Sequence, residues 1–261
     1  MAFWTWKTFV TGGVIAVVIG VAALSPVERA PAQAASSGKP VVIELFTSQS
    51  CYSCPAAEAY LGELIEAKDD VIALEWHVDY WDRLVHGGSA WKDVFSDAAF
   101  TERQRIYATQ LKGRGYSYTP QMVIDGKREA VGSNRGDVSA AIRDLAGEVR
   151  LAVSAQTRPD GMIDITVDGP AEDTVAAIWI VTYLKSHVTE VAGGENKGKT
   201  LANNYIVRRM DRVGDWTGTR VAISAAVTLE AGHGCVVLVQ TDAQGPVLGA
   251  ARCADKDTTR S

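Results

Sequence analysis

Residues 41–55 of the 261-residue chain read VVIELFTSQSCYSCP, and this segment is the most informative about the fold. Its first part is rich in β-branched residues and predicts a buried strand over Val41–Phe46. Ser48-Gln49-Ser50 is a typical start of a helix, which we expect to run to about Ala67 because its apolar residues fall on one face. A C-x-x-C motif therefore stands between a strand and a helix.

The two cysteines of this motif, Cys51 and Cys54, carry the chemistry. A thiolate in the first turn of a helix faces unsatisfied N–H groups and the positive end of the helix dipole, which lower the pKa of the thiol. We therefore expect Cys51 to be an exposed attacking thiol and Cys54 to be the resolving thiol, one turn further inward. The alternatives are half of a zinc site and a static disulfide. A zinc site usually needs a second C-x-x-C or an H-x₃₋₅-H pair, and the sequence has neither.

The rest of the first half predicts an α/β arrangement. Val71–Val78 is expected to be a second strand. Residues 122–131 predict a β-hairpin around Asp125-Gly126, and residues 137–148 predict a closing helix. The stretch 79–112 is rich in aromatic residues and is expected to be a helical insert.

From residue 149 onward the apolar period changes to two. Repeated short strands with Gly-rich turns predict a mainly β, sandwich-like domain. A short helix is expected within it at residues 203–213. The expected strands are residues 149–154, 163–168, 175–184, 220–229 and 235–241. The chain thus divides into an α/β domain over residues 35–148 and a β-rich domain over residues 149–261.

The other two cysteines lie in a predicted hairpin. Val236–Gln240 and Val247–Ala251 flank a turn centred on Gln244, and this geometry places Cys235 opposite Cys253. Directly opposed residues in a non-hydrogen-bonded pair lie about 4.5 Å apart at Cα, which is within the range of a disulfide. We expect a structural bridge here rather than a second redox pair, worth about 3 kcal/mol on the chain-entropy model.

The composition is that of a folded protein, with 47% hydrophobic and 22% charged residues and a net charge of −5. It excludes disordered, collagen-like and coiled-coil chains. The mildly acidic balance argues against nucleic acid as a partner, because nucleic-acid-binding domains usually carry a basic surface.

The N-terminus has the features of an export signal. Lys7 precedes an apolar run over residues 9–24, and Ala32-Gln33-Ala34 offers an A-x-A cleavage site. The run is shorter than the roughly 20 residues that span a bilayer, which favours a cleaved signal peptide, residues 1–34, over a retained anchor. We expect a periplasmic or secreted protein that meets the membrane only through this segment, in a compartment where disulfides persist.

Four stretches of the sequence carry a resemblance to a known family. They are Val42–Pro55 around the C-x-x-C motif, His77–Asp82, Tyr118–Met122 and Gly193–Trp216. In these motifs the chain is similar to the exported, thioredoxin-like domain-of-unknown-function family 1223. The resemblance implies a thioredoxin-like domain followed by a β-rich C-terminal domain.

The resemblance also implies roles outside the C-x-x-C motif. Thr119-Pro120 matches the place where thioredoxin-like folds have a cis-proline that faces the cysteines and pairs with the substrate chain. The carboxylate that many thioredoxins bury under the resolving cysteine would align near Leu45, and Glu44 is one residue away. Period-two alternation places Glu44 on the opposite face of the strand, so a proton-transfer role for it is not supported. The insert 79–112 is also unlike a minimal thioredoxin.

Two other patterns suggest functions that the sequence does not favour. Gly193–Thr200 satisfies the Walker A pattern, but phosphate binding needs a helix after the loop, and this loop lies in a β-rich region. A flexible Gly/Lys loop is the favoured interpretation. His77 and His86, with Asp79 and Asp82, would suit a metal near the C-x-x-C motif, although a histidine at a strand end is more often a hydrogen-bonded structural residue.

The sequence therefore predicts an exported thiol–disulfide oxidoreductase that acts on protein thiols and disulfides through Cys51 and Cys54. Thr119 and Pro120 are expected to position the substrate chain. No metal is expected, and no cofactor beyond the redox-active disulfide. The expected partners are exported protein substrates and a redox partner, with no nucleic acid. The alternatives are a metal-binding protein or metallochaperone that uses the same cysteines with a histidine such as His77, and an interaction module without redox activity.

Overall fold

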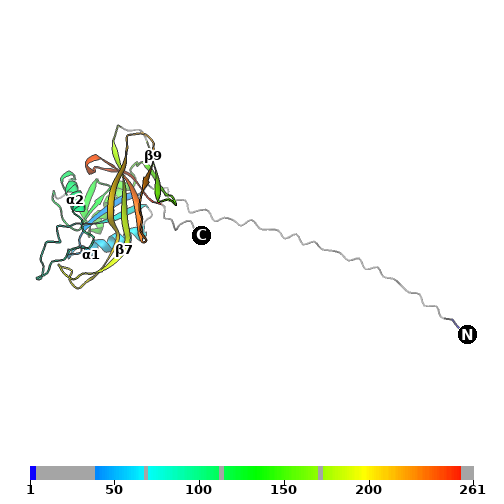
Figure 1. The fold of residues 1–261 in the computed structure, drawn as a ribbon, viewed down its shortest axis with the longest axis horizontal. Coiled ribbons are helices and arrows are strands. Elements are labelled where there is room, and N and C mark those ends of the chain that lie inside the picture. Colours follow the sequence, from blue (N-terminus) through cyan, green and yellow to red (C-terminus); the bar gives the residue numbers. More distant parts are fainter. Residues whose placement is uncertain (4–38, 68–69, 112–114, 170–172, 254–261) are drawn as a thin grey trace. The chain divides into compact units, whose positions relative to one another are not determined.

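The computed structural model describes residues 1–3, 39–67, 70–111, 115–169 and 173–253 (Figure 1). The predicted signal peptide, residues 1–34, lies outside the described residues except for the first three, so export stays a prediction. Within the described ranges, no helix has both the length and the apolar character needed to cross a membrane.

A strand–helix–strand unit begins the fold, as the sequence predicts. It consists of β1 (Val41–Thr47), α1 (Pro55–Ala67) and β2 (Val71–His77). The two strands are parallel, and both are buried along their whole length. Burial on both faces explains why their sequences are mainly apolar runs rather than alternating patterns. The C-terminal end of β1 leads directly into the C-x-x-C motif.

A hairpin and a helix complete the first half of the chain. β3 (Gln121–Ile124) pairs antiparallel with β1 and continues through a tight turn into β4 (Arg128–Val131). Helix α3 (Arg135–Ala146) begins at Asn134, whose side chain accepts a hydrogen bond from the Asp137 N–H. Helices α1 and α3 bury a shared core against β1 that includes Ile43, Leu45, Leu61, Leu64, Val138 and Ile142.

The stretch 79–112 departs from the predicted secondary structure. Only α2 (Ala98–Gln110) is helical, and it starts at a side-chain cap formed by Asp97. Residues 79–97 are turns and loop, so the predicted helical insert is wrong over its first half. Gly87-Gly88 lies in the middle of that segment with positive φ at both residues, a conformation that a right-handed helix does not contain.

Helix α2 packs on the face of the sheet opposite to α1 and α3. Its residues Phe100 and Tyr107 join a core that contains Phe46 of β1 and Trp76 of β2. The Trp76 and Phe100 rings meet edge to face, 5.1 Å apart at their centroids. The first-half strands are therefore covered on both faces.

Four strands of the second half extend the same sheet. They are β7 (Ala176–Glu190), β8 (Thr200–Trp216), β10 (His233–Thr241) and β11 (Val247–Arg252). β8 joins β2 in parallel, with Glu75 opposite Ile206. The sheet has eight strands in the order β11-β10-β7-β8-β2-β1-β3-β4. The helix predicted at residues 203–213 is wrong, because this segment lies inside β8 and its long-range pairing with β7 overrides its local preference.

A second, three-stranded sheet packs against this region. It consists of β5 (Ala152–Thr157), β6 (Met162–Asp168) and β9 (Val221–Ala226) in the order β5-β6-β9. Inward residues of both sheets form one core that includes Ile163, Ile165, Ile178, Ile180, Val237 and Val239. Across the described residues, the fold is thus a mixed α/β arrangement that is mostly β sheet, with few helices.

The predicted register of the last hairpin is confirmed up to Val239, after which a bulge shifts it by one residue and Gln240 pairs with Val247. Val236 pairs with Arg252, and the disulfide Cys235–Cys253 is present with a Cα–Cα distance of 5.3 Å. The Cys253 N–H donates to the Cys235 carbonyl at 2.9 Å. The two cysteines therefore form a hydrogen-bonded pair rather than the expected non-hydrogen-bonded one, which explains the wider Cα spacing.

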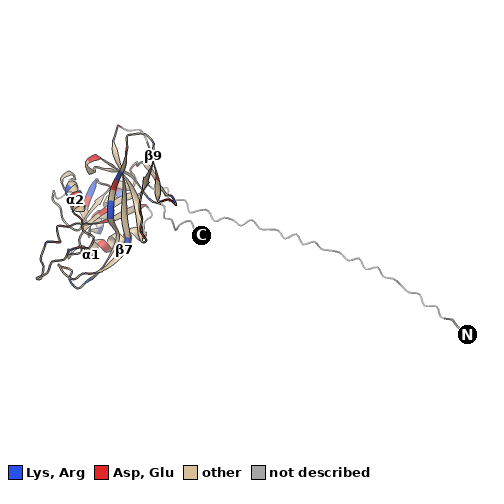
Figure 2. Cartoon of the chain, viewed as in Figure 1, with Lys and Arg blue, Asp and Glu red and all other residues tan. Residues whose placement is uncertain are grey.

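The described residues between 39 and 253 belong to one compact unit. Strands from both sides of residue 149, the predicted boundary between domains, lie in one sheet. Figure 2 shows Lys and Arg interspersed with Asp and Glu along the described elements rather than gathered by sign.

Candidate functional site

The Cys51–Cys54 disulfide stands at the start of α1. The Cα atoms of the two cysteines are 5.4 Å apart. The Cys54 carbonyl accepts hydrogen bonds from the N–H groups of Ala57 and Glu58, so the helix begins at the second cysteine. The Ser53 hydroxyl lies 3.4 Å from Cys51 Sγ, within reach as a donor to that sulfur. The sequence places this motif correctly, because strand and helix propensities fix it locally.

The predicted exposure of Cys51 is wrong. Cys51 is 1% exposed and Cys54 is 0% exposed, whereas the intervening Tyr52 is 68% exposed. The preceding loop, residues 48–50, is buried as well. A polar loop can be buried only where its N–H and C=O groups find partners. Ser48 supplies two of them locally, and Asp93, Glu195 and Asn196 supply others from segments remote in sequence.

The peptide bond Thr119–Pro120 is cis, in agreement with what the family resemblance implies. Pro120 directly precedes β3, whose Gln121 lies opposite Phe46 near the end of β1. An added Cβ at Gly132 would lie 3.0 Å from Ala57 Cβ and 3.3 Å from Pro120 Cβ. Pro120 and Ala57, in the first turn of α1, thus pack against the same glycine, Gly132. This contact lies at the end of the sheet that carries the C-x-x-C motif.

Trp81 holds the neighbouring residue Thr119, because its indole N–H donates to the Thr119 hydroxyl at 2.8 Å. Trp81 comes from the irregular segment between β2 and α2. This part of the chain therefore contributes to the surroundings of the cis peptide bond, although it is not helical as the sequence predicts.

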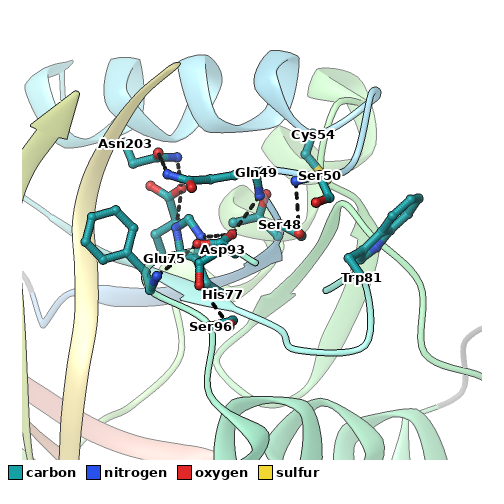
Figure 3. Close-up of polar contacts among 12 residues, drawn as sticks. Ser48, Gln49, Ser50, Cys54, Glu75, His77, Trp81, Asp93, Ser96 and Asn203 are labelled. Carbon is teal, nitrogen blue, oxygen red and sulfur yellow. Dashed lines mark hydrogen bonds and ion pairs between the residues drawn. The ribbon is translucent and has the colours of Figure 1, made fainter. Parts of the chain in front are cut away.

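A histidine between two carboxylates is buried under the C-x-x-C loop (Figure 3). His77 Nδ1 lies 2.7 Å from Asp93 Oδ2, and His77 Nε2 lies 3.1 Å from Glu75 Oε1. All three side chains are buried. Burial by itself lowers the pKa of His77, but the charges and hydrogen bonds of Asp93 and Glu75 outweigh it and raise that pKa well above the usual value. Both ring nitrogens of His77 are engaged by carboxylates.

The network reaches the C-x-x-C loop through Gln49. Its N–H donates to Asp93 Oδ2 at 2.7 Å, and its side-chain oxygen accepts from the Trp91 indole at 3.1 Å. Its side-chain amide donates to the Thr189 hydroxyl on β7 at 2.9 Å. On β8, the Asn203 side chain donates to Glu75 Oε1 at 2.6 Å. The loop that positions the cysteines is therefore fixed from both halves of the chain (Figure 3).

Glu58 is a functional candidate that the sequence analysis misses. It follows Cys54 by four residues on the buried side of α1 and is 2% exposed. The Thr47 hydroxyl donates to Glu58 Oε1 at 2.6 Å. Burial, helped by the charge of Glu75, raises the pKa of Glu58 to about 8. The helical spacing from Cys54 and the apolar neighbour Leu61 are signals that would have found it.

Glu44 lies on the other face of β1, as period-two alternation predicts. Arg103 of α2 donates to its two carboxylate oxygens at 2.6 and 2.8 Å, and the Tyr107 hydroxyl donates at 2.5 Å. Glu44 and Arg103 are both buried. Glu44 is therefore engaged in a buried ion pair that holds α2 against the sheet.

The Walker-A-like loop, Gly193–Thr200, is followed by strand β8 and not by a helix. It lacks the helix N-terminus that the phosphate-binding mechanism needs. Among the described residues, no group of three or more His, Cys, Asp and Glu side chains is placed to hold a metal ion. His77 is committed to its carboxylates, and His86 lies 3.4 Å from the Glu195 carboxylate.

Fold and site together define a class: a mixed α/β protein with a C-x-x-C disulfide at a helix start, above a buried acid–histidine network. The chain belongs to the family described as "Protein of unknown function (DUF1223)", which matches residues 42–240. No curated protein matches it closely.

Two solved structures are similar to this chain. One is the crystal structure of a protein from Agrobacterium tumefaciens, with 28% identity and a TM-score of 0.72 over 87% of this chain and 99% of that one. The other is HBP35 of Porphyromonas gingivalis, with 14% identity and a TM-score of 0.51 over 86% of this chain and 79% of that one. At that identity, the second likeness concerns the fold alone.

Proposed function

We propose that this protein is an exported thiol–disulfide oxidoreductase that acts on protein thiols and disulfides through Cys51 and Cys54. The observation that carries the proposal is the disulfide between these residues at the start of α1, with the buried acid Glu58 one turn away. This arrangement combines an attacking sulfur, a resolving sulfur and a proton-transfer group.

We further propose that residues 35–148 are a thioredoxin-like domain with an insert that contains α2, and that residues 149–261 are a sandwich-like β domain. Support for the first domain comes from the element order β1-α1-β2-α2-β3-β4-α3 and the strand order β2-β1-β3-β4. The position of Thr119–Pro120 beside the first turn of α1 agrees with this assignment, in which these two residues position the substrate chain.

The reaction is a pair of thiol–disulfide exchanges. A substrate thiolate attacks Cys51 Sγ, the Cys51–Cys54 bond breaks, and Cys54 leaves as a thiolate while a mixed disulfide forms. A second substrate thiolate then attacks the substrate sulfur of the mixed disulfide, and Cys51 leaves as a thiolate. Two electrons pass from the substrate to the cysteine pair. The reverse sequence reduces a substrate disulfide, and a partner of the dithiol/disulfide class restores the starting state.

Glu58 exchanges a proton with Cys54 in this scheme. Residues four apart on a helix are neighbours, and both side chains are buried. With a pKa raised to about 8, Glu58 keeps its proton near neutral pH, so it has a proton to give to Cys54 and can take it back at modest cost. The neutral acid protonates Cys54 when the disulfide opens, and the carboxylate accepts that proton when Cys54 attacks.

Substrate access requires local opening, because Cys51 is 1% exposed. Exchange then proceeds from a state in which the segments packed on the C-x-x-C loop have moved apart, as in other local openings of native proteins. The rate of exchange with a small thiol therefore reports on this opening, whereas the equilibrium position reports on the cysteine pair itself.

A glutathione redox titration of the exported form, with alkylation and peptide mass spectrometry, tests the proposal. It resolves Cys51–Cys54 from Cys235–Cys253, which serves as an internal structural control. A Cys51–Cys54 potential between about −120 and −270 mV is expected, the range of exchange catalysts. A potential below about −300 mV would mark a structural bridge and overturn the proposal.

The two rival functions make different predictions. A metal-binding protein would hold stoichiometric copper or zinc that is lost on Cys51→Ser. The engagement of both His77 nitrogens by Asp93 and Glu75 favours the oxidoreductase over a metal site that includes His77. A redox-inactive interaction module would lose nothing but stability on Cys51→Ser or Cys54→Ser.

A further inference from the structure

The loop that resembles a Walker A motif lies against the C-x-x-C loop. It joins β7 to β8, and we call residues 193–199 the clasp. Asn196 is fully buried in it, and its side-chain amide donates to the Gln49 carbonyl at 2.9 Å and the Cys51 carbonyl at 2.8 Å. The clasp therefore fixes the backbone on both sides of Ser50.

A glycine allows the two loops to approach this closely. Gly194 has a φ of +69°, and an added Cβ there would lie 2.8 Å from the Ser50 hydroxyl oxygen. The next residue, Glu195, donates its own N–H to the Ser50 carbonyl at 3.3 Å. Both the approach and the φ value require glycine at this position.

Glu195 brings a negative charge to the C-x-x-C motif. Its Oε2 accepts a hydrogen bond from the Tyr52 N–H at 2.8 Å, directly after Cys51 in the chain. Its side chain is 29% exposed. Two basic side chains lie nearby. His86 Nδ1 lies 3.4 Å from Glu195 Oε1, and Lys199 Nζ donates to Asn196 Oδ1 at 2.9 Å and lies 4.4 Å from the centre of the Tyr52 ring.

This contact opposes formation of a thiolate at Cys51 in two ways. Backbone N–H groups at a helix start stabilise a nearby thiolate, but the Tyr52 N–H is already bound to a carboxylate. The carboxylate, held at the N–H of the residue that follows Cys51, also brings a like charge towards a thiolate there. The positive charge of Lys199 favours a thiolate, but Lys199 contacts the Tyr52 ring, whereas Glu195 contacts the Tyr52 backbone N–H.

We infer that Glu195 is a positioning residue that lowers the reduction potential of the Cys51–Cys54 pair, so that the protein donates electrons to substrate disulfides. The inference rests on the proposed function. The dithiol of Cys51 and Cys54 is oxidised to the disulfide, the substrate disulfide is reduced to two thiols, and a dithiol partner regenerates the reduced pair.

The variant Glu195→Gln tests this inference, because a glutamine oxygen still accepts the Tyr52 hydrogen bond while the charge is removed. A like charge within about 6 Å shifts a pKa by about one or more, and partial exposure places Glu195 at the low end of that range. We expect the pKa of the Cys51 thiol to fall by about one. At a pH where Cys51 is ionised in both proteins, the equilibrium with glutathione should move about tenfold towards the reduced form, which corresponds to about 30 mV.

Glu66→Gln is the matched control, because it removes the same charge from an exposed position at the other end of α1. Glu66→Gln should leave the pKa of the Cys51 thiol and the equilibrium with glutathione at their wild-type values. The difference between Glu195→Gln and wild type should also shrink at high salt, since the carboxylate is partly exposed to counterions. A merely structural role of the clasp would give no such salt dependence.

An equilibrium for Glu195→Gln within twofold of wild type, or a shift towards the oxidised form, would overturn the inference. Failure of the proposed function gives a different result. In that case the wild-type Cys51–Cys54 pair has the potential of a structural bridge. The difference in its equilibrium with glutathione between wild type and Glu195→Gln can still be measured, so the two failures are distinguishable.

Discussion

Replacing Glu58 by glutamine is expected to change the pH dependence of stability in a definite direction. Glutamine has nearly the shape of the protonated acid, and its oxygen can still accept the hydrogen bond from Thr47. Because the folded-state pKa of Glu58 is about 8 and the ordinary value is 4.5, the folded protein keeps a proton that the unfolded chain has lost between these limits. The contribution of Glu58 to the free energy of unfolding therefore falls as pH rises from about 4.5 to about 8.

The size of this effect follows from the two pKa values. A difference from 4.5 to about 8 corresponds to about 5 kcal/mol at most. Water penetration and relaxation reduce the cost of a buried charge, so we expect the stability of Glu58→Gln relative to wild type to rise by about 2–5 kcal/mol over this range. His77 and Asp93 are unchanged in the variant, so their titration contributes to the pH dependence of stability in both proteins.

Urea unfolding at a series of pH values, with both disulfides intact, measures this difference. Glu66→Gln on the same helix is the control and should run parallel to wild type at every pH. A Glu58→Gln curve that also runs parallel to wild type would show that Glu58 titrates normally in the folded state. In that case the carboxyl is ionised at neutral pH, and its role as the proton partner of Cys54 would be refuted.

Three further predictions follow from the site and its supports. Cys54→Ser should trap a mixed disulfide with a disulfide-containing substrate, because the Cys51 thiolate attacks the substrate disulfide, one substrate thiol leaves, and no Cys54 remains to resolve the product; the adduct is visible by mass spectrometry without reductant, and a Cys51→Ser protein that traps as much would contradict the order of attack. Replacing Cys235 and Cys253 together by serine should cost about 3 kcal/mol of unfolding free energy while the Cys51–Cys54 potential stays at its wild-type value; a changed potential would show that the second bridge is coupled to the first. Arg103→Met should cost about 3–5 kcal/mol, because it leaves the buried Glu44 carboxylate without its partner, and a loss below about 1 kcal/mol would show that this ion pair is dispensable.

Local patterns were sufficient for much of the fold. The β-branched run before residue 48 and the helix-forming run after Cys54 place the C-x-x-C motif at a helix start, because each propensity acts over a few neighbouring residues. The register of the β10–β11 hairpin, and with it the Cys235–Cys253 bridge, follows from the length of one turn. The opposite orientation of Glu44 follows from the two-residue period of a strand.

Tertiary contacts decided what the local patterns could not. Aromatic residues in the segment 79–97 resemble a helix face, but their partners are Thr119 and Gln49, so the segment is a loop. The pairing of residues 203–213 with β7 makes them a strand. In both cases the stabilising partners lie far along the chain, and local propensity is weak by comparison.

Local sequence patterns were enough to place both cysteine pairs: a C-x-x-C pair between strand and helix, and a second pair across a hairpin. The environment of those sulfurs depends on contacts that form only on folding. The tertiary structure buries Cys51, places His77 between two carboxylates, raises the pKa of Glu58 and brings Glu195 onto the Tyr52 N–H from 143 residues away. The physical reason is that burial and charge act through space, and their strength depends on the distances and desolvation that folding creates.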